Sequence, residues 1–414
     1  MRKWRVILTI VILCAAGGRG NAMCSNSCEV EPRAAVQVDS ITTAVESDSI
    51  APAGGNEAVK GEKKRGFWGK FFKQLFRGDK DRSFEKGIDF TYTLYPMYSR
   101  ETGVGIGGVV TALYRIDRRD SITPPSDAQL LAGVSLKGAY KVSIAGNNYF
   151  NSKSRLVYDV YFVNKPIDFW GISYASCVTN SAASYTRRQI EADVEYLYNI
   201  NKRVLIGAVL NVGYSYLPRI NNLSYLDGEA TSYLLTGVGV SLSYDSRDFI
   251  PNAQEGVFLQ IREMIYPQFM GNAHKSIFTT TLRANYYRPL WRGSVIALDL
   301  YSYYSGSNSP WPLRVEMGGD NARMRGYYVG RYIDNNQLNF QVELRQRVYK
   351  RIGVVGWIGY GTVYPSLKGL RLRNFLYNYG VGFRWEIKHR INLRVDIGFG
   401  YKSFGVVVNL REAF

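Results

Sequence analysis

The side chains that most often carry catalytic or metal-binding chemistry are sparse in this sequence. Its 414 residues include two histidines, His274 and His389, which fall in turns predicted at opposite ends of the same set of strands. An imidazole triad or a zinc cluster needs several such side chains close together, and this spacing does not provide them. We therefore expect no enzymatic activity, no metal site and no cofactor.

Two other chemically suggestive features have simpler explanations. The glycines within residues 103–108 (GVGIGG) match a dinucleotide-binding pattern, but they lie inside a strand run and no helix follows. We interpret them as glycines that face inward or allow close packing. The net charge of +18 is spread along the chain without a recognition helix or zinc spacing. It predicts contacts with anionic lipid head groups and a solvated interior, and not a nucleic-acid partner.

The first 22 residues have the organisation of an export signal. A basic start (Arg2, Lys3, Arg5) precedes an apolar run over residues 6–16, and small residues follow at 20–22. This order is the architecture of a secretory signal peptide. We therefore expect residues 1–22 to direct the chain out of the cytoplasm.

Residues 23–65 are rich in Ala, Ser, Glu, Gly and Thr and have no sustained apolar period. Such a segment cannot bury enough surface to offset the entropy of ordering, so it predicts a disordered periplasmic linker. In an oxidising compartment Cys24 and Cys28 could form a local disulfide or remain as thiols, and Cys177 would have no partner.

From residue 88 to residue 414 the hydrophobic pattern changes to period two. In 338–345 and 391–400 apolar residues alternate with polar ones or glycine. Runs of about ten residues suit a tilted crossing of a ~30 Å hydrocarbon core, whereas strands of soluble sandwiches are shorter. No run of roughly 20 apolar residues follows residue 22, which excludes a helical membrane bundle.

Lipid offers no hydrogen-bond partner to an open sheet edge, so the sheet must close. The sequence therefore predicts an all-β membrane protein, a closed antiparallel transmembrane β-barrel of about 16 strands. Long connections at 165–184, 217–229, 307–335 and 365–373 are expected outside the cell and short turns in the periplasm. The predicted strand starts are near 88, 103, 128, 140, 154, 185, 202, 230, 255, 274, 292, 336, 351, 374, 391 and 404.

Residues 66–77, before the barrel, predict one short amphipathic helix. Apolar side chains recur at helical spacing, with Lys70, Lys73 and Gln74 between them. Two placements are open: on the periplasmic surface of the membrane, or packed at the mouth of the barrel. The apolar face consists of Phe67, Trp68, Phe71, Phe72, Leu75 and Phe76.

The 307–335 connection contains EMGGDNARMRGYY, with Gly318, Gly319, Arg325, Gly326 and Tyr327. This segment resembles the Arg-Gly-Phe/Tyr tip of the sixth outer loop in the bacterial surface-antigen outer-membrane barrels. That superfamily holds the barrel-assembly and translocation-assembly proteins and the two-partner secretion transporters. The resemblance implies that Arg325 points into the barrel, and the alternative is a solvent-exposed arginine. A buried guanidinium needs an acid as its ion-pair partner. Glu343 lies on the inward-facing side of the strand that follows the loop and could supply this acid.

Two further signatures follow the family's order. Asp245, Arg247, Asp248, Pro251 and Gly256 resemble an Asp-rich inner turn that leads through Pro and Gly into a new strand, with four residues between Pro and Gly where the family usually has two. Val406, Val408, Leu410 and Phe414 resemble the C-terminal signal read by the outer-membrane insertion machinery, a partner during biogenesis. We expect the Phe414 ring to lie among lipid tails at the inner interface.

The chain departs from the family pattern at two places. In the family, the strand after the one with Glu343 usually carries a second acid in a Phe-x-Asp-x-Gly pattern, but Gly359 stands at that position here. We call the pairing of the loop arginine with acids of the barrel wall the lock, and the missing acid predicts that the lock is incomplete. The assembly members also carry polypeptide-transport-associated (POTRA) domains, and residues 23–87 are too short for even one typical copy. A separate periplasmic partner or the 66–77 helix would then have to deliver substrates.

Two classes of function fit this pattern. The first is an outer-membrane barrel that assists insertion or export of protein or lipid substrates through a weak seam between its first and last strands. Pro96 in the first strand removes a backbone donor and Gly405 lies in the last, which favours such a seam. The second is a passive pore or a structural surface barrel without translocation activity. In either case outer-membrane lipids surround the protein.

Overall fold

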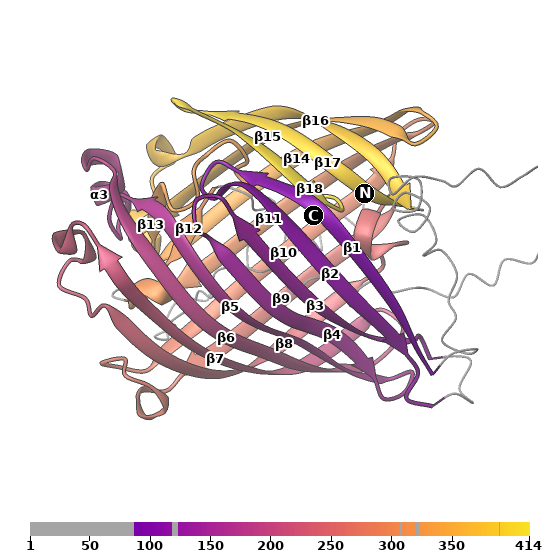
Figure 1. Ribbon diagram of the computed structural model, residues 1–414, viewed down its shortest axis with the longest axis horizontal. Coiled ribbons are helices and arrows are strands. Elements are labelled where there is room, and N and C mark those ends of the chain that lie inside the picture. Colours follow the sequence, from indigo (N-terminus) through magenta and orange to yellow (C-terminus); the bar gives the residue numbers. More distant parts are fainter. Residues whose placement is uncertain (1–86, 118–122, 307–308, 319–322, 389) are drawn as a thin grey trace, which may run out of the picture.

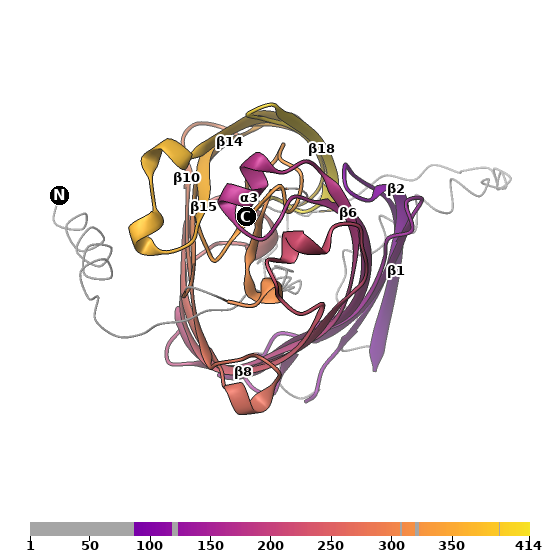
Figure 2. The same cartoon turned by 90° about the vertical axis from the view of Figure 1, so that its left-hand side faces the viewer.

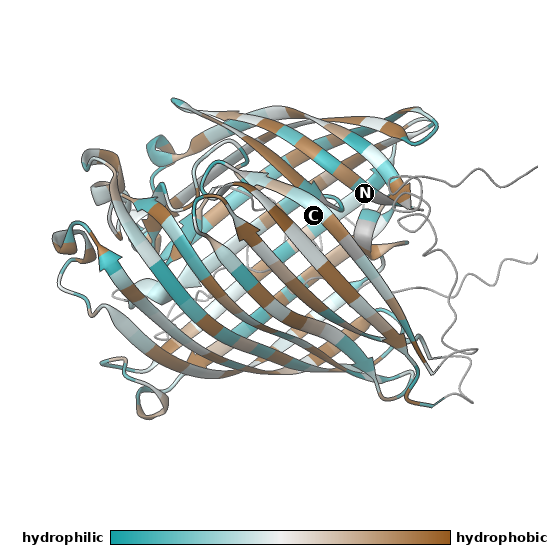
Figure 3. Cartoon of the chain, in the orientation of Figure 1, coloured by the Kyte–Doolittle hydropathy of each residue, from teal (hydrophilic) through white to brown (hydrophobic). Residues whose placement is uncertain are grey.

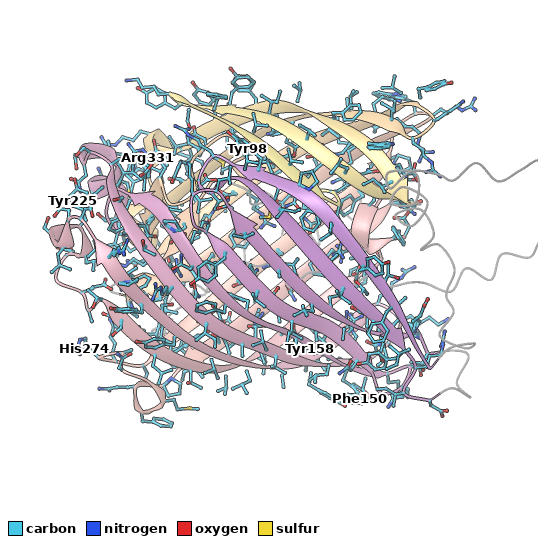
Figure 4. All side chains as sticks on the ribbon, in the orientation of Figure 1. Tyr98, Phe150, Tyr158, Tyr225, His274 and Arg331 are labelled. Carbon is cyan, nitrogen blue, oxygen red and sulfur yellow. The ribbon has the colours of Figure 1, made fainter. Side chains whose placement is uncertain are left out.

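A computed structural model describes residues 87–117, 123–306, 309–318, 323–388 and 390–414. The expected export signal (1–22), linker (23–65) and amphipathic helix (66–77) lie outside these residues. So do Cys24, Cys28, Gly319 and His389. His274 lies in a connection at one end of the barrel, and the first strand of the barrel begins at the opposite end (Figure 4).

Within the described residues, sixteen strands form one closed antiparallel barrel, which confirms the predicted fold class (Figure 1). Each observed strand begins within three residues of its predicted start. The strands are β1 (Ile88–Ser99), β2 (Gly103–Tyr114), β3 (Ser126–Ser135), β4 (Tyr140–Tyr149), β5 (Ser154–Phe169), β6 (Ala183–Asn199), β7 (Val204–Ile220), β8 (Ser232–Asp245), β9 (Gly256–Tyr266), β10 (Ile277–Pro289), β11 (Ser294–Ser305), β14 (Asn336–Tyr349), β15 (Ile352–Tyr364), β16 (Leu376–Lys388), β17 (Ile391–Gly400) and β18 (Ser403–Leu410).

The alternating sequence explains why these segments become barrel strands. In β7, Ile206, Leu210 and Tyr214 are exposed on the outside, while Asn211 and Ser215 are buried inside. Because successive side chains of a strand point to opposite faces, one face meets lipid and the other fills the lumen. Figure 3 shows the same alternation of hydrophobic and hydrophilic residues along many strands. No helix in the described part of the chain is long and apolar enough to cross a membrane.

Three long connections fold inward over the outer mouth (Figure 2). The β5–β6 connection carries α3 (Tyr174–Thr179), the β7–β8 connection carries η1 (Leu223–Leu226), and the β11–β14 connection carries η4 (Trp311–Leu313) with the hairpin of β12 (Val315–Met317) and β13 (Tyr332–Asp334). The sequence had predicted long connections here but neither α3 nor the hairpin. Remaining short helices are η2 (Ile250–Asn252), η3 (Gln268–Met270), η5 (Leu367–Gly369) and η6 (Leu372–Asn374).

The inward connections share one hydrophobic core with the upper barrel wall. Leu226, Trp311, Met317 and Tyr332 are buried in it together with Cys177. The indole of Trp311 donates to the Ala230 carbonyl at 2.8 Å, and Arg314 pairs with Glu229. Cys177 is a free thiol, and burial raises its pKa to about 12. The outer mouth is therefore covered by packed protein.

The barrel closes between β1 and β18, where the ladder is shortest. A single residue pair, Tyr98 with Val408, joins the two strands. By contrast, β5 and β6 pair along their length from Ser154–Tyr198 to Phe169–Ala183. Figure 1 shows that β1 and β18 move apart toward the end of the barrel at which β1 starts. The seam is thus the weakest backbone junction in the described barrel.

Candidate functional site in the barrel lumen

Arg325, at the tip of the β11–β14 connection, is fully buried inside the barrel. Its Nη2 donates to Glu343 Oε2 at 2.5 Å and its Nη1 to Asp396 Oδ2 at 2.7 Å. Glu343 lies on β14 and Asp396 on β17. The guanidinium also stacks over the Trp357 ring, 3.7 Å from its centroid. The structure therefore brings together Arg325 and Glu343, the pair expected from the sequence, and excludes the solvent-exposed placement.

Asp396 supplies the second carboxylate that the sequence analysis did not find. No acid stands at position 359, and a Cβ there would come 2.4 Å from Asn378 Oδ1, so even a small side chain would crowd the site. The second carboxylate comes instead from β17, two strands beyond β15 in the barrel order. The expectation of an incomplete lock was wrong because it considered only the position that the family normally uses.

The lock belongs to a larger network of buried charges. Glu343 accepts from Arg345 Nε at 2.8 Å, and Asp396 accepts from Arg384 Nη1 at 2.5 Å. Glu412, after β18, accepts from Arg384 Nε at 2.8 Å. Four arginines, including Arg394, thus surround three acids. In such a network, removal of an acid leaves buried positive charge without its partner, and removal of Arg325 takes a close cation from both Glu343 and Asp396.

Glycines let the loop tip press against the last strands. Gly326 has φ +110°, a conformation that L side chains rarely adopt. A Cβ on Gly398 of β17 would lie 2.4 Å from the Arg325 carbonyl oxygen. A Cβ on Gly318, where φ is +106°, would lie 2.8 Å from Tyr327 Cβ. Gly326 and Gly398 therefore allow the loop to approach the wall closely, and Gly318 allows the loop to pack against itself.

Hydrogen bonds tie the same tip to both sides of the seam. The Tyr327 hydroxyl donates to the Tyr377 carbonyl at 2.7 Å and accepts from the Tyr401 N–H at 2.8 Å. Ser403 Oγ, at the start of β18, donates to the Gly326 carbonyl at 2.8 Å. On the β1 side, the Val329 N–H donates to the buried carboxylate of Glu101 at 2.8 Å. The loop thus bridges the strands that the backbone ladder barely joins.

The predicted inner-turn residues form a turn that reaches across the opposite mouth. Asp245 holds Arg247 through a 2.7 Å ion pair. Asp248 accepts hydrogen bonds from the N–H groups of Gln254 and Glu255. It also forms a 2.6 Å ion pair with Arg390, which lies in the turn between β16 and β17. Burial alone would raise the pKa of Asp248, but these hydrogen bonds and Arg390 lower it overall. Pro251 lies in η2, and Gly256 opens β9 with φ +116°.

The expected position of Phe414 was wrong. Val406 and Val408 lie in β18 and Leu410 ends it, but Arg411 has φ +71° and the chain turns inward. The Phe414 ring packs 6.4 Å from the Tyr287 ring, and Arg345 Nη2 donates to its main-chain oxygen at 2.9 Å. Tyr287 is buried with Ala253 of the inner turn. The ring therefore lies inside the barrel mouth and not among lipid tails, because β18 ends before it.

Sequence reasoning missed Glu101, Arg384, Asp396 and Glu412 as members of the site. Alternation had already placed Asp396 and Arg394 on the polar face of their strand, so the inward direction could have been read. The ion-pair partners of these side chains could not be predicted from the sequence, because Arg325 and Asp396 are 71 residues apart. In the described part of the chain, no group of three or more His, Cys, Asp or Glu side chains is placed to hold a metal ion.

The geometry defines a closed outer-membrane barrel whose longest loop is locked inside the lumen by an arginine. The model of the Omp85 superfamily domain matches residues 128–403, more than half of the chain, and the chain therefore belongs to the Omp85 superfamily. It is accordingly an outer-membrane protein of a Gram-negative bacterium. No POTRA domain lies in the described residues.

Solved structures share this fold. BamA from Haemophilus ducreyi lacking POTRA domains 1–3 is 12% identical over 77% of this chain and 69% of that chain, with a TM-score of 0.51. CdiB from Acinetobacter baumannii is 11% identical over 79% of this chain and 60% of that chain, with a TM-score of 0.52. CdiB from Escherichia coli is 10% identical over 78% and 63%, also at 0.52. The match spans less than two thirds of either CdiB chain, and at these identities the likeness concerns the fold alone. No curated protein sequence matches the chain.

Proposed function

We propose that this barrel assists insertion or export of protein or lipid substrates across the outer membrane, and that substrates engage it at the β1–β18 seam. The observation that carries this proposal is the single residue pair, Tyr98 with Val408, that joins the two strands. Among the described residues, no strand pairs with β1 on that side between Ile88 and Met97. A strand edge that no other strand of the barrel covers is a template for another chain, and in lipid its backbone groups need hydrogen-bond partners.

The covered outer mouth weighs against the alternative of a passive pore. Trp311, Leu226 and Tyr332, from two different outer connections, are buried in one core. Arg331 donates to the Cys177 carbonyl and Tyr174 N–H donates to Asp334 Oδ2, which joins the β5–β6 connection to the β11–β14 connection. Figure 4 shows Arg331 and Tyr225 at this outer end. Opening a water-filled path would require this core to separate.

Delivery of substrates would fall to a separate periplasmic partner or to residues 66–77. The rings of Phe71 and Phe72 together with Lys70 and Lys73 suit the surface of an anionic membrane. A peptide of residues 66–77 should bind anionic vesicles, and Phe71→Ser with Phe72→Ser should weaken that binding. High salt should weaken the electrostatic remainder. A peptide that ignores vesicles would leave delivery to the partner.

Depletion of the protein, followed by an inventory of outer-membrane proteins and lipids, tests the proposed function. We expect a defined set of barrel proteins or lipids to fall, and expression of the wild-type chain to restore it. Expression of the Arg325→Ala variant should restore it poorly. If the inventory stays unchanged while uptake of small hydrophilic solutes drops, the protein is a pore and the proposal fails.

A further inference from the structure

The β15–β16 connection, residues 365–375, behaves differently from the other long outer connections. The connections that carry α3, η1 and η4 fold inward over the mouth, whereas this one projects sideways outside the barrel wall (Figure 2). Its short helices η5 and η6 face away from the lumen in that view. A residue of β15 shows whether the connection lies on the lipid side or on the lumen side of the wall.

Thr362, near the outer end of β15, fixes that side. It shares a face of the strand with Ile358 and Tyr360, which are 59% and 54% exposed and point to lipid. Thr362 is nevertheless fully buried, and its Oγ1 donates to the Asn374 carbonyl at 3.1 Å. The connection therefore rests on the lipid-facing surface of the barrel at its outer rim.

Tyrosines below the connection mark the level of the lipid head groups. Tyr360, Tyr377 and Tyr379 are exposed on the outer wall, and the last two stack with ring centroids 6.4 Å apart. Aromatic girdles lie at the interface between hydrocarbon and head groups. Residues 365–375, just above these rings, thus lie at the height of lipid phosphates in the outer leaflet.

The composition of the connection suits that position. Leu367 and Leu372 are 63% and 86% exposed, so their apolar surfaces are open to the acyl chains beside the wall. Lys368, Arg371 and Arg373 alternate with them and are exposed. The sequence contains no acid between Glu343 and Glu386. None of the three basic side chains has an ion-pair partner among the residues that the structure describes.

We propose that residues 365–375 bind a phosphorylated lipid of the outer leaflet. Lys368, Arg371 and Arg373 take its phosphate groups, and Leu367 and Leu372 enter the boundary of its acyl chains. Arginine and lysine near a charged surface attract phosphate, and adjacent apolar side chains add buried area. This site is independent of the seam and of any transported substrate.

Binding of diphosphorylated lipid A to the folded barrel in neutral detergent tests the proposal. The variant Lys368→Gln, Arg371→Gln, Arg373→Gln should bind roughly tenfold more weakly or worse. A matched control removes three exposed charges at the opposite end, Lys153→Gln, Lys202→Gln and Arg203→Gln, and should bind like the wild type. The charge-conserving variant Lys368→Arg, Arg371→Lys, Arg373→Lys should retain binding.

A second measurement needs no variant. The wild-type barrel should bind lipid A stripped of both phosphates much more weakly than the intact lipid, and added salt should reduce the difference. Equal binding of the two lipids, or an equal loss in the control at the opposite end, overturns the proposal. Retained binding by the triple glutamine variant overturns it as well.

Discussion

The β1–β18 seam and the β5–β6 wall belong to one sheet but are held together in different ways. In the wall, the backbone ladder runs unbroken from Ser154–Tyr198 to Phe169–Ala183. At the seam the ladder is reduced to Tyr98–Val408, and side chains add to it, with Arg100 Nη1 donating to Ser403 Oγ at 3.0 Å. The loop tip then reaches both strands from inside. We therefore expect closure of the seam to depend on the locked loop, and pairing in the wall to be independent of it.

The largest effect that this comparison predicts follows from Arg325→Ala. The change breaks two buried ion pairs at once and empties the space that the fully buried Arg325 side chain fills, although Arg345 still pairs with Glu343 and Arg384 with Asp396; we expect a cost of about 3 kcal/mol. We expect a lower unfolding temperature in detergent and faster hydrogen exchange in β1, β18 and the 307–335 loop, with little change in β5 and β6. A double-mutant cycle with Glu343→Ala should show strong coupling.

The matched control for that variant is Arg262→Ala, which breaks the lumenal pair of Arg262 with Asp193 in the wall. Both groups are partly exposed, so its effect should be smaller and should not reach the seam. Absence of coupling between positions 325 and 343, or equal exchange in seam and wall, would contradict the role of the lock.

A smaller effect is expected from Gly398→Ala. The new Cβ would lie 2.4 Å from the Arg325 carbonyl oxygen, so the loop tip must move, at a cost of about 1–3 kcal/mol. Gly356→Ala is the control, because a Cβ at Gly356 meets nothing within 4 Å. Thermal unfolding of both variants in detergent measures the difference. Equal stability of the two would show that the tip does not rest against β17.

The smallest effect on the stability of the folded barrel should come from deletion of Phe414. The ring is partly buried against Tyr287 and Arg345, in a cluster that includes Ala253 of the inner turn, and it makes none of the ion pairs of the lock. We expect a modest loss of thermal stability, together with less folded barrel in the outer membrane if the C-terminal signal operates. Phe404→Ala, on the exposed face of β18, controls for the loss of an aromatic ring. Undiminished membrane insertion would count against the signal.

The strands of the barrel wall could be predicted from the sequence more completely than the ion pairs of the lock. Period-two alternation is a local property, so the strands, their starts and the inward face of Glu343 could be predicted from it. The lock could be predicted only in part, because Asp396 and Glu412 reach Arg325 and Arg384 through closure of the barrel. Phe414 was misplaced because the strand pattern gave no sign that β18 would end at Leu410 and that the chain would turn inward at Arg411.

A disulfide across the seam tests the central claim most directly. Tyr98→Cys with Val408→Cys joins the directly paired positions of β1 and β18, and Val160→Cys with Ala192→Cys does the same for β5 and β6. Each pair is expressed in cells depleted of the wild-type protein. The seam pair should fail to restore the outer-membrane inventory when oxidised and should restore it when reduced, whereas the wall pair should restore it in both states. Full restoration by the oxidised seam pair would contradict passage or assembly at this junction.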